Sequence, residues 1–567
     1  MTVIGSLPPF AIFFAGALLA GVTRGWVRGG LMLLVPIFGG LNLLMMDGGY
    51  TWQEPFLDYT LTLVQLDKLS LLFGYLFHIA ALFGVIYALH VRDTVQQTSA
   101  LLYAGSALGA VFAGDMIVLF IFWELLALSS VFLIWARGSE RAYSAGMRYL
   151  IVQIASGVIL LAGILVKVNT TGSIAIETMT LAGPAAWLIL IAIGIKCCFP
   201  FLHNWLTDAY PEATPTGTVF LSAFTTKVAV YALARTFPGT ELLVYIGGAM
   251  AMFPIFFAVI ENDLRRVLAY SLINQVGFMV VGIGIGTELA INGAVSHAFN
   301  DVIFKGLLFM TMGAVLYRTG KINGSELGGL YKSMPWTTGF CIVGAASISA
   351  FPLFSGFVSK SMVMVAALDE GYPIIWLMLL FASAGVFHHA GIKIPFFAFF
   401  AHDSGIRTKE APWNMLIAMG LAAALCIFNG SYPAVLYSLL PYQVDYVPYD
   451  STHVLTQLQI LFFSALAFVW LKLSGIYPPE LPSVNLDAEW FYRRLIPRAA
   501  VGIGRMIDNL YQGFLAIARG LIGGMVESSA RNFGPAGILG RTTQLGNSVA
   551  LVAVVLTITL IIAYANG

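Results

Sequence analysis

Ionisable side chains stand inside long apolar stretches of this sequence, where a charge is costly. Glu124 lies in IVLFIFWELLALSSVFLI, Lys196 in LILIAIGIKCCFPF and Lys227 in FLSAFTTKVAVYALA. A charge at the centre of a bilayer costs at least ~2.5 kcal/mol on insertion scales. Each such residue therefore needs a partner or water. The candidate site residues are Glu124, Lys196, Lys227, His297, Asp301, Lys305, Lys360, His388 and Lys393.

Proton transfer explains such a set better than structural ion pairing does. A single buried charge is often a fixed ion pair, but buried pairs stabilise a protein less than apolar packing. Repeating that cost on several helices makes little sense without a use. Burial disfavours the charged forms of lysine and glutamate, so both can exchange protons near neutral pH. Histidine titrates there unaided. A glutamate whose distance from a lysine changes can switch that lysine between holding and releasing a proton.

The spacing of His297, Asp301 and Lys305 places them on one face of a helix, because each is four residues from the next. Asp301 can then pair with Lys305 or accept a proton from His297. A metal held by the histidine and the aspartate is geometrically possible, but a lysine on the same face would repel the cation. We therefore expect no metal site. The neighbours His388 and His389 point to different faces, so at most one of them faces the interior.

Composition identifies the elements that must hold these residues. Of 567 residues, 59% are hydrophobic and only 10% are charged, against about 25% charged in an ordinary soluble domain. The mean hydropathy is +0.86. A span needs roughly 20 apolar residues, and the sequence contains about sixteen such stretches. They begin near residues 7, 29, 68, 98, 116, 146, 184, 215, 241, 264, 290, 338, 373, 412, 455 and 546.

The fold class expected is therefore an all-α polytopic membrane protein. The positive-inside rule places the N-terminus outside and the loops after odd-numbered spans in the cytoplasm. The N-terminal MTVIGSLPPF lacks the basic region of a cleaved signal peptide, so we expect the first helix to be retained. The basic residues of those cytoplasmic loops are Arg24, Arg28, Arg92, Arg137, Arg141, Arg148, Arg265, Arg266, Arg318, Lys321, Lys332, Arg407 and Lys409.

Other kinds of chemistry have no motif here. The four cysteines lie in apolar stretches and match neither a disulfide framework nor a metal motif. No P-loop and no glycine-rich dinucleotide fingerprint is present. The net charge of +1 gives no reason to expect a nucleic-acid partner. We expect no cofactor, so energy must come from an ion gradient or from another subunit.

Two interrupted apolar stretches indicate an internal repeat. Pro200 lies in IKCCFPFLHNWL, and Pro352 and Gly356 lie in SISAFPLFSGFVSK, five spans further on. An odd shift reverses the topology, and paired broken helices in opposite orientation are typical of transporters built from inverted repeats. Freed backbone groups are tolerated only beside a cavity or a site. His203, close after the first break, either bridges the core to cytoplasmic water or lies at the membrane interface.

The chain divides into six segments on this interpretation. Residues 476–545 mix arginines with apolar residues and predict an amphipathic helix on the cytoplasmic face, or a brace for a neighbouring subunit. The segments are 1–97 with N-terminal spans, 98–236 with the first five-helix repeat, 241–403 with the second, inverted repeat, 412–475 with C-terminal spans, 476–545, and the terminal span 546–567.

Several motifs also resemble a known family. FWELLALSS, IKCCFPFLHNWLTDAYPEATPTGTVFLSAFTTKVAVYALAR, ENDLRRVLAYSLINQVGFM, SHAFNDVIFKGLLF and PLFSGFVSK are similar to the antiporter-like subunits shared by Mrp-type cation/proton antiporters and respiratory complex I. The resemblance covers roughly residues 65–400. NWLTDAYPEATP and FHHAGIKIPFFAFF are most similar to the D subunit of Mrp-type sodium/proton antiporters. The family resemblance implies about fourteen core helices, two inverted five-helix bundles, and breaks in the seventh and twelfth helices. In this chain a C-terminal extension follows them.

The resemblance also implies roles for single residues. Glu124 matches the glutamate of the fifth helix, Lys196 its lysine partner in the broken seventh helix and Lys227 the lysine of the eighth. His297 and Lys305 match the helix that links two half-channels, and Lys360 matches the terminal lysine of the second. Where the family commonly has a second histidine, this chain has Asp301. That aspartate can relay protons or favour a bound cation.

These observations predict a proton-translocating subunit of a multisubunit Na⁺/proton antiporter in a bacterial inner membrane. It would be a transporter subunit rather than an enzyme, with other membrane subunits, protons and Na⁺ as partners. One alternative is the proton-pumping module of a redox enzyme related to complex I or a membrane hydrogenase, which iron–sulfur subunits in the same complex would favour. Another is a proton channel that energises inorganic carbon uptake. The last alternative is a structural scaffold whose buried charges transfer no protons.

Overall fold

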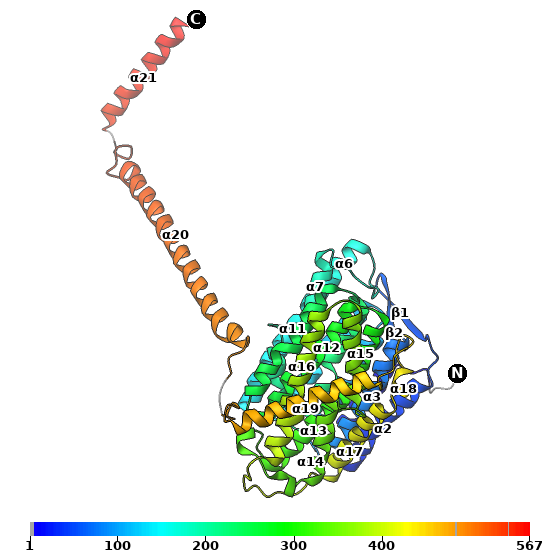
Figure 1. Cartoon of the computed structure of the whole chain (residues 1–567). Helices are drawn as coiled ribbons and strands as arrows, with labels where there is room; N and C mark the ends of the chain where they lie inside the picture. Colours follow the sequence, from blue (N-terminus) through cyan, green and yellow to red (C-terminus); the bar gives the residue numbers. More distant parts are fainter. Residues whose placement is uncertain (1–4, 482–484, 543, 567) are drawn as a thin grey trace. The chain divides into compact units, whose positions relative to one another are not determined.

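Almost all of the regular structure is helical in the computed structural model, which describes residues 5–481, 485–542 and 544–566 (Figure 1). Twelve of the described helices are long and apolar enough to cross a membrane, which confirms the expected polytopic all-helical fold. Two shorter apolar helices add to them, α1 and α7. Each of the sixteen predicted spans begins within six residues of the start of an observed helix, the largest difference being at α6, which starts at Glu140.

Within its described residues, the N-terminal half contains ten α-helices. They are α1 (Pro9–Val22), α2 (Gly25–Leu44), α3 (Lys68–Ala88), α4 (Thr94–Phe112), α5 (Met116–Trp135), α6 (Glu140–Thr171), α7 (Pro184–Lys196), α8 (Asn204–Ala209), α9 (Gly217–Ala223) and α10 (Thr225–Thr236), with a 3₁₀ turn η1 (Tyr210–Glu212). Four of them, α3 to α6, begin at a side chain that accepts from the free N–H groups of the first turn. Asp67 and Ser70 cap α3 reciprocally, for example.

The second half continues through a similar set. It contains α11 (Glu241–Ile260), α12 (Leu264–Ile285), α13 (Glu288–Thr319), η2 (Gly324–Glu326), η3 (Leu330–Lys332), α14 (Pro335–Ile348), α15 (Ser355–Asp369), α16 (Pro373–Val386), η4 (Phe387–Lys393), η5 (Phe396–Phe400), α17 (Trp413–Ser431), α18 (Pro433–Tyr437) and α19 (Ser451–Leu473). η2 and η3 are 3₁₀ turns, whereas η4 and η5 are π-helical.

A β-hairpin was not part of the all-helical expectation. β1 (Thr51–Phe56) and β2 (Tyr59–Gln65) pair antiparallel between α2 and α3. Asp115 connects the hairpin to the bundle by a hydrogen bond, because its carboxylate accepts from the N–H of Thr62 at 2.6 Å. The same carboxylate caps α5 by accepting from the N–H groups of Ile117 and Val118 at 2.9 Å.

Several arginines predicted in loops lie in helices instead. Arg28 is buried in α2, and Arg148 lies in α6, where it pairs with Asp208 at 2.6 Å. Arg265 and Arg318 belong to α12 and α13. The hydropathy pattern locates the apolar part of a helix, but α6 and α13 run 32 residues each, longer than a bilayer requires.

Two stretches of the chain share a series of local features. α6 and α13 have the same length, and each ends at a glycine with left-handed backbone, Gly172 and Gly320. The helices that follow, α7 and α14, each begin with a proline, which suits the first turn because its missing N–H is not needed there. They stop after 13 and 14 residues.

The breaks at the ends of α7 and α14 are built alike. The N–H groups of Cys197 and Phe199 donate to the carbonyls four and five residues back, and those of Ser349 and Phe351 do the same. The residues between them have left-handed backbone, with φ 63° at Cys198 and φ 57° at Ala350. This conformation costs an L-residue about 1–2 kcal/mol. The recurrence supports the predicted repeats at 98–236 and 241–403, whose bounds stay a prediction.

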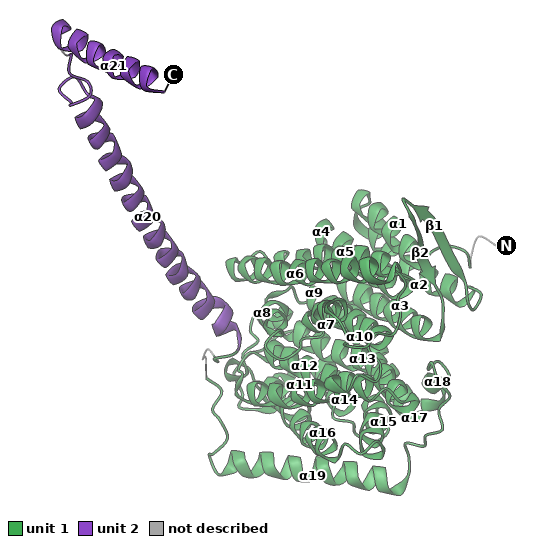
Figure 2. Ribbon diagram, turned by 90° about the horizontal axis from the view of Figure 1, so that it is seen from above, with its two compact units in different colours: residues 1–487 green, residues 488–567 purple. Residues whose placement is uncertain are grey.

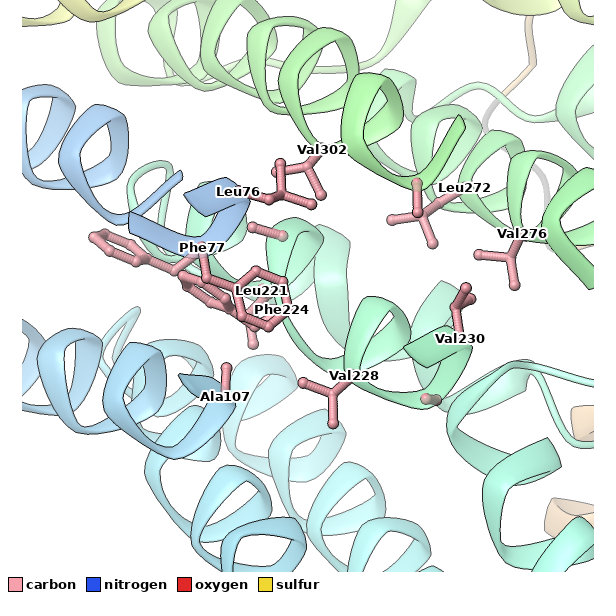
Figure 3. Close-up of a cluster of buried hydrophobic side chains, with 14 of the residues drawn as sticks. Leu76, Phe77, Ala107, Leu221, Phe224, Val228, Val230, Leu272, Val276 and Val302 are labelled. Carbon is pink, nitrogen blue, oxygen red and sulfur yellow. The ribbon is translucent and has the colours of Figure 1, made fainter. Parts of the chain in front are cut away.

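The central helices α9, α10, α12 and α13 carry four of the nine candidate residues. The buried share of the apolar window is 94% in α12, 94% in α13 and 100% in α9 with α10. Apolar side chains from α3, α9, α10, α12 and α13 pack around this centre, among them Phe77, Leu221, Val228, Val276 and Val302 (Figure 3). Such packing excludes lipid and restricts water to polar side chains.

Residues 488–567 form a second unit, distinct from the bundle of residues 1–487 (Figure 2). The second unit contains a π-helical turn η6 (Phe491–Leu495), the long α20 (Ile496–Phe533) and the apolar α21 (Leu545–Ala565). None of the described residues of α20 or α21 is buried. Arginines alternate with apolar residues along α20, as the amphipathic interpretation predicts, whereas α21 is apolar all round.

Candidate functional site

Lys196 is the last residue of α7, immediately before the first break. Its side chain is 0% exposed, and Nζ donates to the carbonyl oxygen of Trp123 on α5 at 2.7 Å. Nζ also lies 4.4 Å from the centroid of the Trp123 ring, a favourable position for a cation. Lys196 thus binds Trp123, the residue that precedes Glu124. The structure therefore brings two candidate residues together, Lys196 on α7 and Glu124 on α5.

Glu124 belongs to α5, and its side chain, which faces α6, is partly exposed. Its Oε1 is buried and has no hydrogen-bond partner. The carboxylate occupies the space that a side chain at Gly157 on α6 would need, because a Cβ there would lie 1.3 Å from Oε1. A glycine at this position therefore makes room for an unpaired carboxylate beside Lys196.

Lys227 and Asp301 form an ion pair at the centre of the bundle. Nζ of Lys227 on α10 lies 2.5 Å from Oδ2 of Asp301 on α13, and both side chains are 0% exposed. The sequence predicted Lys305 or His297 as the partner of Asp301, from their spacing on one helix. The observed partner comes from another helix, 74 positions earlier in the chain. Within the described residues, the two carboxylate oxygens of Asp301 have no hydrogen-bond partner besides this ion pair.

Neutral side chains are the hydrogen-bond partners of the two other candidates on α13. Nζ of Lys305 donates to the hydroxyl of Ser271 on α12 at 2.8 Å. Nε2 of His297 lies 3.1 Å from Oε1 of Gln275 on α12, and Nδ1 lies 3.0 Å from the hydroxyl of Ser359 on α15. Hydroxyls and amides both donate and accept, so they can bridge groups that gain and lose protons.

Lys360 belongs to α15, on the far side of the second break. Its Nζ donates to the carbonyl oxygen of Ile348, the last residue of α14, at 3.0 Å. It also lies 4.9 Å from the centroid of the Phe278 ring. The last carbonyls of a helix have no partner within it. Lys360 therefore satisfies a group that the break has freed, as expected for a charge retained inside an apolar bundle.

Lys393 is the last residue of the π-helical segment η4. Its Nζ donates to the carbonyl oxygens of Val259 and Glu261, at the end of α11, at 2.7 and 2.6 Å. It also lies 3.0 Å from Oε1 of Glu480, which follows α19. π-helical turns are rare and occur frequently at functional sites. Sequence reasoning did not identify Glu480, because it lies 87 positions from Lys393 in a segment with no motif.

The histidine pair separates as the sequence predicted. His389 is fully buried, and neither of its ring nitrogens has a hydrogen-bond partner. His388 is partly exposed and stacks on the ring of Tyr477, with centroids 5.5 Å apart. The structure thus places His388, one of the candidate site residues, at the edge of the bundle and His389 in its interior. Sequence reasoning did not include His389 among the candidates.

The geometry gives a set of buried ionisable groups joined by hydroxyl, amide and carbonyl groups, on helices of both halves of the bundle. Within the described residues, no three His, Cys, Asp or Glu side chains gather as a metal site. The arrangement can hold protons at several positions and pass them on wherever water or a hydroxyl connects two of them.

Comparison with known proteins gives a family match over residues 113–402, to the family described as "NADH:quinone oxidoreductase/Mrp antiporter, TM". Among curated relatives, the A subunit of the Na⁺/H⁺ antiporter of Alkalihalophilus pseudofirmus is 30% identical over 66% of this chain and 53% of its own length. The D subunit of the Na⁺/H⁺ antiporter of the same organism is 29% identical over 50% of this chain and 62% of its own length. The chain thus spans about half to three fifths of these relatives.

Solved structures show the same fold. A chain of the membrane-bound sulfane sulfur reductase, an archaeal respiratory membrane complex, superposes with a TM-score of 0.72 and 22% identity, covering 98% of this chain and 99% of the other. A chain of the Mrp complex from Dietzia sp. DQ12-45-1b gives a TM-score of 0.68 and 20% identity, covering 83% and 100%. Both matches are subunits of multisubunit membrane complexes.

Proposed function

The chain belongs to the NADH:quinone oxidoreductase/Mrp antiporter family, and on this premise we propose that it is the proton-translocating subunit of a multisubunit monovalent cation/proton antiporter. Na⁺ is the cation we propose, because both curated relatives described above are named as parts of Na⁺/H⁺ antiporters, and the D position is the place in the complex we propose. In this function the chain is a transporter subunit, and its partners are further membrane subunits.

The observation that carries this proposal is that three lysines are buried without a carboxylate as ion-pair partner. Lys196, Lys305 and Lys360 are 0–1% exposed and donate to a carbonyl, a hydroxyl and a carbonyl. In the described part of the chain, no carboxylate lies within 4.0 Å of their Nζ atoms. A lysine fixed for structure alone would be paired with a carboxylate. A lysine bound to neutral acceptors can lose its proton without leaving an unpaired carboxylate behind.

The route we propose follows these groups through the bundle, roughly in the membrane plane. Glu124 and Lys196 begin it, and the Lys227–Asp301 ion pair joins α10 to α13. His297, Lys305 and Lys360 continue it. Ser271, Gln275 and Ser359 supply hydroxyl and amide bridges between helices. Asp301, in this route, acts as a proton relay whose charge is balanced by Lys227.

The proposed route is tested with Lys196→Ala and Glu124→Ala in the assembled complex. Each variant removes a proton-holding group, so cation-driven proton movement in proteoliposomes should fall by at least about tenfold. Assembly, measured by recovery of the partner subunits in mild detergent, should be normal. Unchanged antiport rates in both variants, at normal expression, would reject the route and the proposed function with it.

A second candidate function is the proton-pumping module of a redox enzyme. The observation that favours it is the match to the chain of the archaeal respiratory complex, which covers 98% of this chain and so includes the C-terminal extension, whereas the Mrp match covers 83%. Copurification distinguishes the two. Iron–sulfur subunits recovered with the chain in mild detergent would favour the redox complex, and a complex of membrane subunits alone would favour the antiporter.

A further inference from the structure

The segment after α19 folds back onto the bundle and inserts its side chains there. This strap consists of the described residues 474–481 and 485–487. Tyr477 is 5% exposed, stacks on His388 and meets Phe468 edge-on at 5.2 Å. Asn485 donates to Oε2 of Glu261 at 3.1 Å. The strap is therefore packed against the bundle at both of its described parts.

Glu480 brings a carboxylate from the strap to a candidate site residue. Its side chain is 6% exposed, and Oε1 lies 3.0 Å from Nζ of Lys393, which is itself fully buried. The other partners of Lys393 are backbone carbonyls at the end of α11. Glu480 is thus the carboxylate that balances Lys393. Removing one member of a buried pair leaves the other charge uncompensated, which costs far more than the pair gains.

Asp487 makes a similar contact at the other end of the strap. Its Oδ2 accepts from the hydroxyl of Tyr270 on α12 at 2.7 Å and lies 3.1 Å from Nε2 of His203. His203 follows the first helix break and precedes α8. The other ring nitrogen of His203 is buried without a hydrogen-bond partner. The Asp487 carboxylate therefore fixes the orientation of the His203 ring against α12.

We propose that the strap supplies two positioning residues and extends the proton route to Lys393 and His203, with Glu480 balancing the charge of Lys393 and Asp487 orienting the ring of His203. This inference rests on the proposed function. The strap touches the first half of the bundle through His203 and the second through Lys393. Loss of the Lys393 proton leaves the Glu480 carboxylate buried without a counter-charge.

A double-variant comparison in the assembled complex tests this role. Glu480→Gln should lower proton movement in proteoliposomes at least fivefold, because Lys393 loses its counter-charge. In a Lys393→Met background the same change should have no further effect, since its target is gone. Glu480→Asp should recover at least half of the rate. Glu489→Gln, just beyond the strap in an exposed pair with Arg493, is the matched control and should behave as the wild type.

The possible outcomes distinguish a failure of the strap proposal from a failure of the proposed function. Equal losses from Glu480→Gln in both backgrounds would show a structural role only and overturn the proposal, as would an unchanged rate in the single variant. If Glu480→Gln fails to assemble, Glu480→Asp is used alone, and an unchanged rate there overturns the proposal. Full activity of Lys196→Ala would reject the proposed function itself, whereas loss in Lys196→Ala with full activity in Glu480→Gln would reject the strap alone.

An independent observation concerns a basic hollow between the ends of α2 and α4. It measures about 1080 Å³ and is lined by Arg24, Arg28, Arg92, His90 and Trp26, among others. Arg28 is only 5% exposed, yet its guanidinium donates only to neutral acceptors, the carbonyls of Thr23 and Arg92 and Oε1 of Gln97. Within the described residues none of the three arginines makes an ion pair.

The residues that line the hollow favour an anionic ligand located at the membrane surface. The neighbouring carboxylate of Asp93 is engaged at the start of α4, where it accepts from the N–H of Val95 at 3.0 Å. Gly25 and Gly30 leave open space, because a Cβ at either would meet nothing within 4 Å. Trp26 is 88% exposed, as aromatic residues at a membrane interface are. Guanidinium groups bind phosphate with paired hydrogen bonds.

We infer that this hollow binds the phosphate headgroup of an anionic phospholipid. The test uses the purified complex and native mass spectrometry with added phosphatidylglycerol or phosphatidylcholine. Phosphatidylglycerol should be retained, and Arg24→Gln with Arg92→Gln should weaken its retention at least fivefold. Lys321→Gln with Lys409→Gln is the matched control.

Several outcomes would overturn this second inference. They are equal retention of phosphatidylcholine, unchanged retention in the arginine variant, and displacement of the lipid by inorganic phosphate at millimolar concentration, which would identify a free anion as the ligand. A partner protein that covers Arg24 and Arg92 in the assembled complex, detected as protection of a cysteine placed at Trp26, would also overturn it.

Discussion

At the scale of single residues, the Lys227–Asp301 pair makes the sharpest prediction. Both side chains are fully buried, and Asp301 is the carboxylate that balances Lys227. Asp301→Asn leaves a buried lysine without a counter-charge, so the free energy of unfolding should fall by about 3 kcal/mol. Proton movement should fall as well, because the relay is lost. Thermal unfolding in detergent and proton uptake in proteoliposomes measure the two effects.

A double variant distinguishes stability from transport at this pair. Lys227→Met with Asp301→Leu replaces the ion pair by apolar side chains, which is often neutral or stabilising in a packed interior. Stability should return to that of the wild type while proton movement stays lost. Recovery of transport in the double variant would show that the pair only holds α10 to α13.

Gly157 carries a second prediction at the same scale. A Cβ at this position would lie 1.3 Å from Oε1 of Glu124, so Gly157→Ala must displace the carboxylate. Misplacing a reacting group by about 1 Å costs up to ~100-fold in rate, and proton movement should fall accordingly. Gly339→Ala on α14, where a Cβ meets nothing within 4 Å, is the control. A wild-type rate in Gly157→Ala would mean that the position of Glu124 is unimportant.

Sequence could locate the buried charges but not all of their partners. An ionisable residue within an apolar stretch is visible from hydropathy alone, as with Lys196 and Lys360. The partner of Asp301 lies on another helix, and four-residue spacing reports only neighbours on the same one. The interior position of His389 follows from π-helical turns, which add residues to a turn and shift every face beyond them. No spacing rule predicts where such a turn occurs.

At the scale of elements, the close approach of α14 and α15 can be tested through Gly356. A Cβ there would lie 2.0 Å from the carbonyl oxygen of Ser347, so only glycine permits this distance. Gly356→Ala must part the two half-helices and draw Lys360 from the carbonyl of Ile348. We expect lower thermal stability and at least a tenfold loss of proton movement.

The outcome is compared with Gly339→Ala, which lies on the same α14 in open space. That control should keep both stability and rate. A rate unchanged in Gly356→Ala despite a lower unfolding temperature would contradict a functional role for the second break. It would leave the left-handed residues Ala350 and Leu353 as structural features only.

The spans were predictable because a bilayer demands long apolar segments, and Pro200 and Pro352 marked the breaks. The hairpin at residues 51–65 was missed because short exposed strands carry no comparable constraint. The strap was also beyond prediction. Its contacts join Glu480 and Asp487 to residues far away in the chain, and nothing in the segment itself distinguishes them from solvent-exposed carboxylates.

At the scale of the whole molecule, the division at residue 487 separates two kinds of surface. Residues 1–487 bury their own core, whereas α20 and α21 bury none of their described residues. Apolar side chains on α20, such as Phe514 at 69% exposure, need a membrane or another protein to cover them. We therefore expect the second unit to serve assembly rather than the stability of the bundle.

A chain that stops after Asp487 tests this expectation. Because α20 and α21 contribute no buried residue, the truncated chain should unfold within about 2 °C of the full chain, a difference of well under 1 kcal/mol. Recovery of the partner subunits in mild detergent should fall at least fivefold, since their attachment is lost. Truncation after Leu473 is the comparison, for it also removes Tyr477 and Glu480 and should lower the unfolding temperature. Full recovery of the partners by the 1–487 chain would show that the bundle alone makes the assembly contacts.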